Sequence, residues 1–150
     1  MRNKVVAIAN QKGGVGKTTT AVNLSACLAT QGCKILLVDI DPQGNATSGL
    51  GVERSEVGWS TYHVLMNECS IEDAAIPTDI PGLSVIPSTT DLAGAEVELV
   101  AHMAREFRLR EALARTTEDY DFILLDCPPS LGLLTINALS ASNTVLLPVQ

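Results

Sequence analysis

A glycine-rich segment close to the start of the chain carries residues that could bind phosphate. Residues 10–20 read NQKGGVGKTTT and lie between an apolar run, 4–9, and apolar residues at helical spacing over 17–30. Glycines let backbone N–H groups approach an anion closely, and the N-terminus of a helix adds positive potential. Lys17 can reach the β and γ phosphates of a nucleotide, and the Thr18 hydroxyl can bind Mg²⁺. The segment therefore predicts a nucleotide-binding loop between a strand and a helix.

The loop departs from the strict phosphate-loop pattern G-x-x-x-x-G-K-[ST]. Residues 16–18 match the end of the pattern, but Gln11 occupies the place of its first glycine. A second lysine, Lys12, stands directly before the glycines. Its type and place leave two interpretations open, a solvated loop lysine and a cation that contacts phosphate.

Aspartates stand at the ends of two further predicted strands. Asp39 and Asp41 lie at the end of 34–40, and Asp126 ends 121–126. Because side chains alternate along a strand, Asp39 and Asp41 leave it on the same side. Asp126 is expected to hold Mg²⁺, since a phosphate site of this kind needs a carboxylate for the metal. The alternative is that Asp126 only forms the turn before two prolines.

The rest of the sequence alternates between strand and helix patterns. Strands are expected at 4–9, 34–40, 83–87, 121–126 and 143–149, and helices at 17–30, 60–65, 71–76, 91–115 and 133–141. This alternation predicts an α/β protein with a doubly wound, mostly parallel sheet flanked by helices. Ligands of such sheets bind at the carboxyl ends of the strands, where the polar clusters 10–18, 39–45 and 126–130 stand. In the longest helix, Met103 and Phe107 are expected to face the core.

Size and composition limit what the chain can be. Its 150 residues, 46% of them hydrophobic, suffice for one domain with a real core. The net charge of -7 excludes a polycation that binds nucleic acid with its whole surface. The four cysteines lack a CxxC pair, so reduced and mostly buried thiols are expected. We find no signal peptide or membrane-spanning run in the sequence and expect a cytoplasmic location. An apolar strand before Gln150 with no helix to cover it suggests a longer protein.

Several segments together resemble one family. KGGVGKT is similar to the deviant Walker A loop of the ParA/MinD family of P-loop ATPases, in which the extra lysine is the signature. The segments LLVDIDPQGNATSGLG (36–51), VIPSTTDLAGAEVEL (85–99) and LLDCPPSLGLLTINAL (124–139) resemble ParA-type partition ATPases, particularly the chromosomal, Soj-like branch. The resemblance covers essentially the whole chain. It implies a P-loop NTPase fold in which 1–150 is the N-terminal part of a single-domain protein of about 250 residues.

The resemblance also implies roles for single residues. The nucleotide would be bound by the loop residues Lys12, Gly13, Gly14, Val15, Gly16, Lys17, Thr18 and Thr19. Lys12 would reach across to phosphates held by a second subunit, and Asp41 would orient the attacking water, so these two and Lys17 would be the catalytic residues. Thr18, Asp126 and Asp39 would form the Mg²⁺ site, although Asp39 has the alternative role of capping the loop after its strand. Residues 128–132 would form a switch that senses the γ-phosphate.

The function that the resemblance implies is a partition ATPase, which hydrolyses ATP slowly with Mg²⁺ and closes into a homodimer when ATP is bound. A ParB/Spo0J-like partner protein would stimulate hydrolysis. The dimer would bind DNA without sequence preference through residues beyond Gln150, which implies a nucleoid-associated location and no membrane contact. Two alternatives stay open: a MinD-like regulator of the division site, and a nucleotide-binding interaction module without turnover. Nitrogenase-type iron proteins match less well, because the cysteine placement and the DCPPSLG segment do not resemble theirs.

Overall fold

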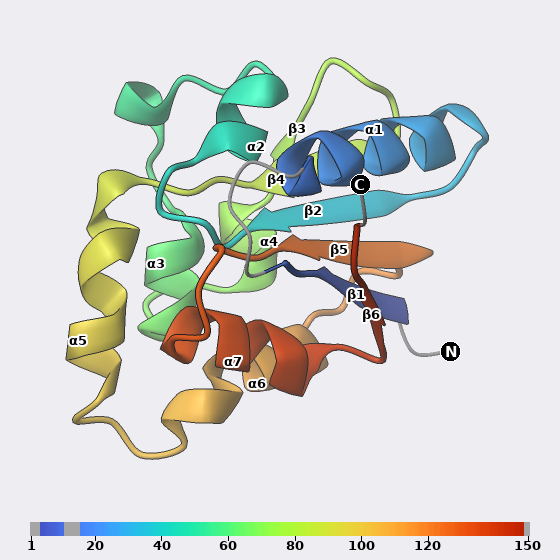
Figure 1. The fold of residues 1–150 in the computed structure, drawn as a ribbon. Coiled ribbons are helices and arrows are strands. Elements are labelled where there is room, and N and C mark those ends of the chain that lie inside the picture. Colours follow the sequence, from blue (N-terminus) through green and yellow to red (C-terminus); the bar gives the residue numbers. More distant parts are fainter. Residues whose placement is uncertain (1–3, 11–15, 149–150) are drawn as a thin grey trace.

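The fold is an α/β sandwich, seen in a computed structural model that describes residues 4–10 and 16–148 (Figure 1). Its strands are β1 (Lys4–Ile8), β2 (Ile35–Asp39), β3 (Ile76–Pro77), β4 (Leu83–Ile86), β5 (Phe122–Asp126) and β6 (Thr144–Leu146). Its α-helices are α1 (Lys17–Thr30), α2 (Asn45–Gly49), α3 (Thr61–Leu65), α4 (Ile71–Ala74), α5 (Ala95–Leu99), α6 (Arg108–Ala114) and α7 (Leu133–Ala141). Three short 3₁₀ helices are η1 (Arg54–Glu56), η2 (Thr90–Gly94) and η3 (Arg105–Phe107).

The six strands form one sheet in the order β3-β4-β2-β5-β1-β6. All neighbouring strands are parallel except β3, which runs antiparallel to β4. This confirms the predicted fold class. In the register of the sheet, Asp126 is paired with Ile8 on one side and with Asp39 on the other. The carboxyl ends of β1, β2 and β5 are therefore level, and the segments that follow them meet at one edge.

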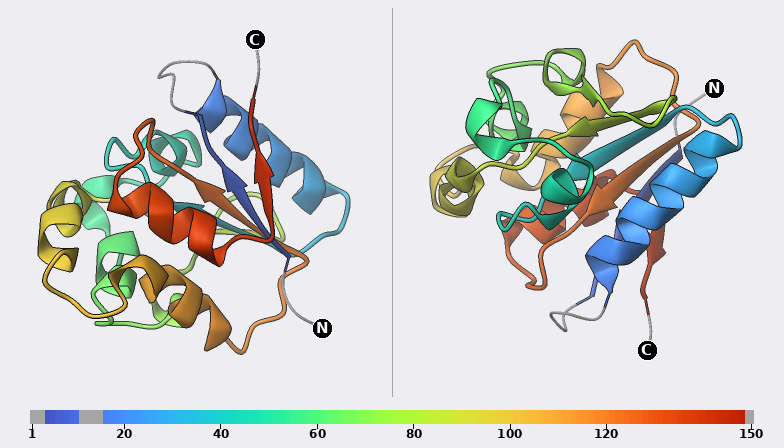
Figure 2. Two further views of the ribbon diagram at one scale, coloured as in Figure 1. Left: turned by 60° about the horizontal axis from the view of Figure 1, so that its bottom comes forward. Right: turned by 90° about the horizontal axis from the view of Figure 1, so that it is seen from above.

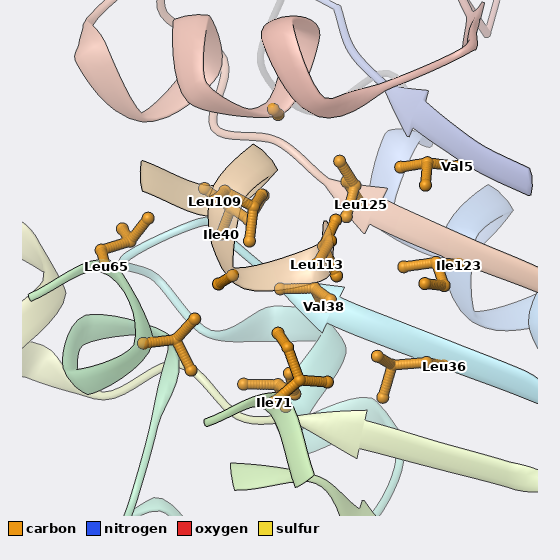
Figure 3. Packing of buried hydrophobic residues seen from close by; sticks show 14 of the residues in the cluster. Val5, Leu36, Val38, Ile40, Leu65, Ile71, Leu109, Leu113, Ile123 and Leu125 are labelled. Carbon is orange, nitrogen blue, oxygen red and sulfur yellow. The ribbon is translucent and has the colours of Figure 1, made fainter. Parts of the chain in front are cut away.

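Helices cover both faces of the sheet. In Figures 1 and 2, α1 crosses one face, while α6 and α7 lie on the other. The strand side chains alternate accordingly: Ile35 and Leu37 of β2 pack on the α1 side, and Leu36 and Val38 pack on the opposite side. Figure 3 shows the apolar cluster on the side of the sheet opposite α1, in which the strand residues meet Leu65, Ile71, Leu109 and Leu113 from the helices. Because both faces are covered, β2 is buried along its whole length, as its apolar run ILLV before Asp39 requires.

The predicted helix over 91–115 is wrong. The segment is divided into η2, α5, η3 and α6, and Ala104 between them has a left-handed φ of 56°. The division has a long-range cause. The side chain of Asn137 in α7 accepts a hydrogen bond from Leu109 N (3.1 Å) and donates one to Arg105 O (2.8 Å), so it fixes a new helix start there. Met103 is 90% exposed and Phe107 41% exposed, so neither is the core residue that we expected.

Several smaller elements also test the sequence interpretation. The short helices expected at 60–65 and 71–76 are present as α3 and α4, whereas α2 and β3 were not predicted. The cysteines are free, but only Cys127 is buried, so the expectation of mostly buried thiols is wrong. Within the described residues, no helix is both long enough and apolar enough to cross a membrane.

Candidate functional site

The first turn of α1 meets the end of β5 at the level edge of the sheet. Lys17 Nζ lies 2.6 Å from Asp126 Oδ1, and the Thr18 hydroxyl donates a hydrogen bond of 3.1 Å to Asp126 Oδ2. Asp126 is fully buried and Lys17 is 7% exposed. The predicted phosphate-binding lysine and the predicted metal-binding hydroxyl are thus in direct contact with the predicted metal-binding carboxylate, which is more than a hundred residues away from them in sequence.

A second carboxylate shares the same ammonium group. Asp41 Oδ2 lies 3.7 Å from Lys17 Nζ, and the side chain of Asp41 is 8% exposed. Burial raises the pKa of Asp126, and the neighbouring Lys17 ammonium opposes that rise. Two nearly buried carboxylates and one cation form a site in which a further positive charge would be stabilised.

The N-terminus of α1 is arranged to receive an anion. Gly16 stands at the N-cap with a left-handed φ of 81°, and no side chain of the described residues caps the helix. The first N–H groups of a helix have no partner within it, and this helix of 14 residues carries the full dipole of a long helix. Thr19 is exposed in this turn. The expected loop residues Lys12, Gly13, Gly14 and Val15 lie outside the described residues, so their roles stay predictions.

Asp39 makes contacts that fit the loop-capping alternative. The residue is fully buried. Its Oδ2 accepts hydrogen bonds from the N–H (2.9 Å) and hydroxyl (2.6 Å) of Thr47, and its Oδ1 accepts one from Asp41 N (3.2 Å). Burial raises the pKa of Asp39 to about 7, the Thr47 hydroxyl opposes this, and the charge of Asp126 adds to it. These contacts hold the segment that carries Asp41, and the role of Asp39 at a metal stays a prediction.

Thr47 and Ser88 complete this support, and neither was identified from the sequence. The Thr47 hydroxyl accepts a hydrogen bond from Ser88 N (2.9 Å), and the Ser88 hydroxyl donates one to Asp41 O (2.7 Å). Both residues are fully buried. They join the ends of β2 and β4 to α2, so they fix where the backbone of Asp41 lies. A threonine in a short helix and a serine after a strand gave no signal, because their partners are distant in sequence.

The titration of Asp39 should make the folded protein less stable at high pH. Its pKa of about 7 in the folded protein lies above the ordinary value of 3.8, so the folded state holds the proton more tightly than the unfolded state does. The contribution of this proton to the free energy of unfolding is fully present below about pH 4 and is lost as the pH rises through about 7. The free energy of unfolding should therefore decrease by roughly 3 kcal/mol between about pH 5 and pH 8. Urea unfolding of the whole protein at both pH values measures it.

Asp39→Asn removes this titration and should reduce the difference in unfolding free energy between the two pH values. It should not abolish the difference, because burial also raises the pKa of Asp126. Asp79→Asn, at an exposed residue, is the matched control and should leave the difference unchanged. An Asp39→Asn protein with the full pH dependence would contradict the assignment.

The segment after Asp126 leads into α7 and is tied to α5. The Thr135 hydroxyl donates to Ser130 O at 2.6 Å, and Leu134 N lies 3.4 Å from Glu96 Oε2. Gly132 at the N-cap has no Cβ, and an added Cβ would collide with the Glu96 carboxylate. The predicted switch, 128–132, therefore leads from the buried carboxylate into α7, whose first turn is hydrogen-bonded to α5, and its sensing role stays a prediction. Among the described residues, no group of three or more His, Cys, Asp or Glu side chains is arranged to hold a metal.

Comparisons with known proteins find relatives over nearly the whole chain. The profile of the AAA domain family matches residues 3–150. The sequence is 58% identical over 147 residues to the sporulation initiation inhibitor protein Soj of Bacillus subtilis, covering 98% of this chain and 58% of that protein. It is 54% identical over 147 residues to the chromosome partitioning protein ParA of Myxococcus xanthus, covering 98% of this chain and 52% of that protein.

A solved structure has the same fold. The crystal structure of cobyrinic acid a,c-diamide synthase from Mycobacterium smegmatis, with bound ATP analog and magnesium, superposes with a TM-score of 0.94 and 44% sequence identity. The superposition covers 99% of this chain and 60% of that chain. The chain thus spans only between 52% and 60% of the length of these relatives.

Proposed function

The chain belongs to the AAA domain family, and on that premise we propose that it is part of a ParA/Soj-type ATPase that acts in chromosome or plasmid partition. The observation that carries the proposal is the contact of Lys17 and Thr18 with Asp126 at the N-terminus of α1. A site for a nucleoside triphosphate and its metal ion requires this combination of a helix N-terminus, a lysine, a hydroxyl and a carboxylate. The similarity to the chromosome partitioning protein ParA of Myxococcus xanthus supports the partition role.

The residues present fit ATP with Mg²⁺. Thr18 Oγ1 and Asp126 Oδ2 are 3.1 Å apart, so the two predicted metal-binding groups already lie side by side. Bound there, Mg²⁺ would neutralise charge on the β and γ phosphates. Lys17, which pairs with Asp126 in this structure, would turn from that carboxylate to the phosphates. Lys17 thus stabilises the carboxylates without nucleotide and the phosphates with it.

Asp41 and Lys12 would act on the reaction itself. The carboxylate of Asp41, close to Lys17, would orient the water that attacks the γ-phosphate. Lys12 would contact the phosphates held by a second copy of the protein in an ATP-bound homodimer. The chain has a net charge of -7, so a triphosphate buried between two copies needs additional positive charge.

Stimulation by a partner protein and binding to DNA are further parts of the proposal, and they follow from the similarity to partition proteins. A ParB-type partner would stimulate weak intrinsic hydrolysis. The ATP-bound dimer would bind DNA without sequence preference, in a nucleoid-associated location. Such binding would rest on contacts with DNA phosphates, and it would weaken steeply with added salt.

Light scattering on the whole protein tests the proposal most directly. With Asp41→Ala to prevent hydrolysis, ATP should double the particle mass, and DNA should bind only to the larger particle. Adding Lys12→Ala should keep the particle monomeric while ATP still binds. Lys4→Ala, at an exposed lysine on β1, is the matched control and should still dimerise. A particle that stays monomeric at saturating ATP, with no ATP turnover in the unaltered protein, would favour the interaction module instead.

A further inference from the structure

The guanidinium group of Arg54 binds the loop that follows Asp41. Arg54, in η1, donates hydrogen bonds from Nη2 to Pro42 O (2.7 Å), from Nη1 to Gln43 O (2.8 Å) and from Nε to Ser88 O (3.0 Å). The first two carbonyls belong to the turn after β2, and the third belongs to the segment after β4. One side chain therefore ties together two loops at the edge where the candidate site lies.

The turn that Arg54 holds also sets the direction of the Asp41 carboxylate. Asp41 Oδ1 accepts a hydrogen bond from Gln43 N (3.0 Å), and Asp41 O accepts one from Gly44 N (2.9 Å). The Asp41 side chain is thus bonded to the same peptide segment whose carbonyls face Arg54. A shift of this turn would move the Asp41 carboxylate relative to Lys17, because the hydrogen bond from Gln43 N couples the carboxylate to the turn.

Local details show that the space and charge at this turn are adapted to a guanidinium. Gly44 has a left-handed φ of 70°, and an ideal Cβ there would lie 2.6 Å from Arg54 Cζ. The glycine therefore leaves room for the guanidinium to lie against the backbone. None of the ion pairs found between described residues includes Arg54. Its planar donors bind carbonyls in a fixed fork, an arrangement that a lysine ammonium cannot reproduce.

We infer that Arg54 is a positioning residue for Asp41. By fixing the turn 42–44 against Ser88, it holds the Asp41 carboxylate where the attacking water must be oriented. This inference rests on the proposed function, since it assigns Arg54 to the hydrolysis step. Among the described residues, no hydrogen bond or ion pair joins Arg54 to Lys17, Thr18 or Asp126, so it should affect the rate of the chemical step more than nucleotide binding.

ATP turnover by the whole protein, unaltered and as Arg54→Ala, Arg54→Lys and Arg110→Ala, tests the inference. Arg54→Ala should lower kcat by about ten-fold and change KM for ATP by less than about two-fold, because a small displacement of a catalytic group slows chemistry without weakening binding. The kcat of Arg54→Lys should lie between those of the unaltered protein and Arg54→Ala, since an ammonium can still donate hydrogen bonds to some of the three carbonyls. Arg110 of α6, whose guanidinium lies over the ring of Phe107, is the matched control and should change neither constant.

The outcomes separate the inference from the proposed function. A folded Arg54→Ala protein with unchanged kcat would overturn the inference alone, and so would a rise in KM that matches the fall in kcat. If Arg54→Ala does not fold, Arg54→Lys decides, and a kcat equal to that of the unaltered protein would count against a positioning role. Absence of turnover in the unaltered protein would overturn the proposed function and this inference with it.

Discussion

Replacing Lys17 by alanine is expected to lower the affinity of the whole protein for ATP by about a hundred-fold. A charged donor that binds phosphate contributes up to about 3 kcal/mol, and each 1.4 kcal/mol is about ten-fold in a dissociation constant. In this structure Lys17 is nearly buried and is held between Asp126 and Asp41 at the N-terminus of α1. Isothermal titration with a non-hydrolysable ATP analogue measures the change.

The same replacement should destabilise the protein without nucleotide. It removes the cation between two nearly buried carboxylates, and an uncompensated buried charge costs about 3 to 5 kcal/mol. Loss of Lys17 also removes the charge that opposes the rise in the pKa of Asp126. The Asp126 carboxyl would then take up a proton more readily, so the deficit in unfolding free energy should be largest near neutral pH and should shrink as the pH falls.

Lys34→Ala serves as the control for both effects. Lys34 pairs with Glu118 at the surface, where the two side chains are 51% and 43% exposed, and it precedes β2 at the other end of the sheet. Exposed pairs of this kind contribute about 1 kcal/mol or less, and ATP affinity should not change. Unaltered ATP affinity in the Lys17→Ala protein would contradict the assignment of Lys17 to the phosphates.

The parts of the fold that the sequence predicts are those that leave a pattern within one continuous segment. The strands β2 and β5 appear as apolar runs, ILLV and FILL, each followed by a terminal aspartate, because both faces of a parallel sheet are covered. The helix α1 follows its glycine loop and ends close to Gly32, as its pattern predicts. Since carboxyl ends of parallel strands meet at one edge, the sequence pattern alone also predicts that Lys17 and Asp126 converge.

The parts that were missed depend on contacts between distant segments. The break near Ala104 follows from hydrogen bonds with Asn137, which is more than thirty residues away from Arg105. The different roles of Asp39 and Asp41 likewise depend on Thr47, which donates two hydrogen bonds to Oδ2 of Asp39. Arg54 gave no signal, because its partners are main-chain carbonyls and these carry no sequence code.

The candidate site combines groups from one segment with groups that are held by contacts between distant segments. The groups that would touch the phosphates, Lys17 and Thr18, come from one contiguous motif. The groups that would set the position of Asp41 come from three separate elements, through Thr47, Arg54 and Ser88. Nucleotide binding should therefore tolerate changes in the loops after β2 and β4, whereas hydrolysis should be sensitive to them.

Replacing Asp41 by alanine should slow ATP hydrolysis by about a hundred-fold or more while ATP stays bound. A positioned group that assists proton transfer or orients a reacting water contributes typically about 10² to 10⁴ in rate. Lys17 and Thr18 keep Asp126 as their partner without Asp41, so the phosphate-binding groups should remain in place. Single-turnover hydrolysis, with nucleotide affinity measured separately, distinguishes the chemical step from binding.

Asp41→Asn separates the charge of this residue from its geometry. An asparagine side-chain oxygen can still accept the hydrogen bond from Gln43 N, so the turn should keep its form. If the negative charge orients the water, the asparagine variant should be as slow as the alanine variant; if only the turn matters, it should retain most of the activity. Asp79→Ala, at an exposed residue that precedes β4 at the opposite end of the sheet, should hydrolyse ATP at the unaltered rate. Full activity in the Asp41→Ala protein would show that another group orients the water.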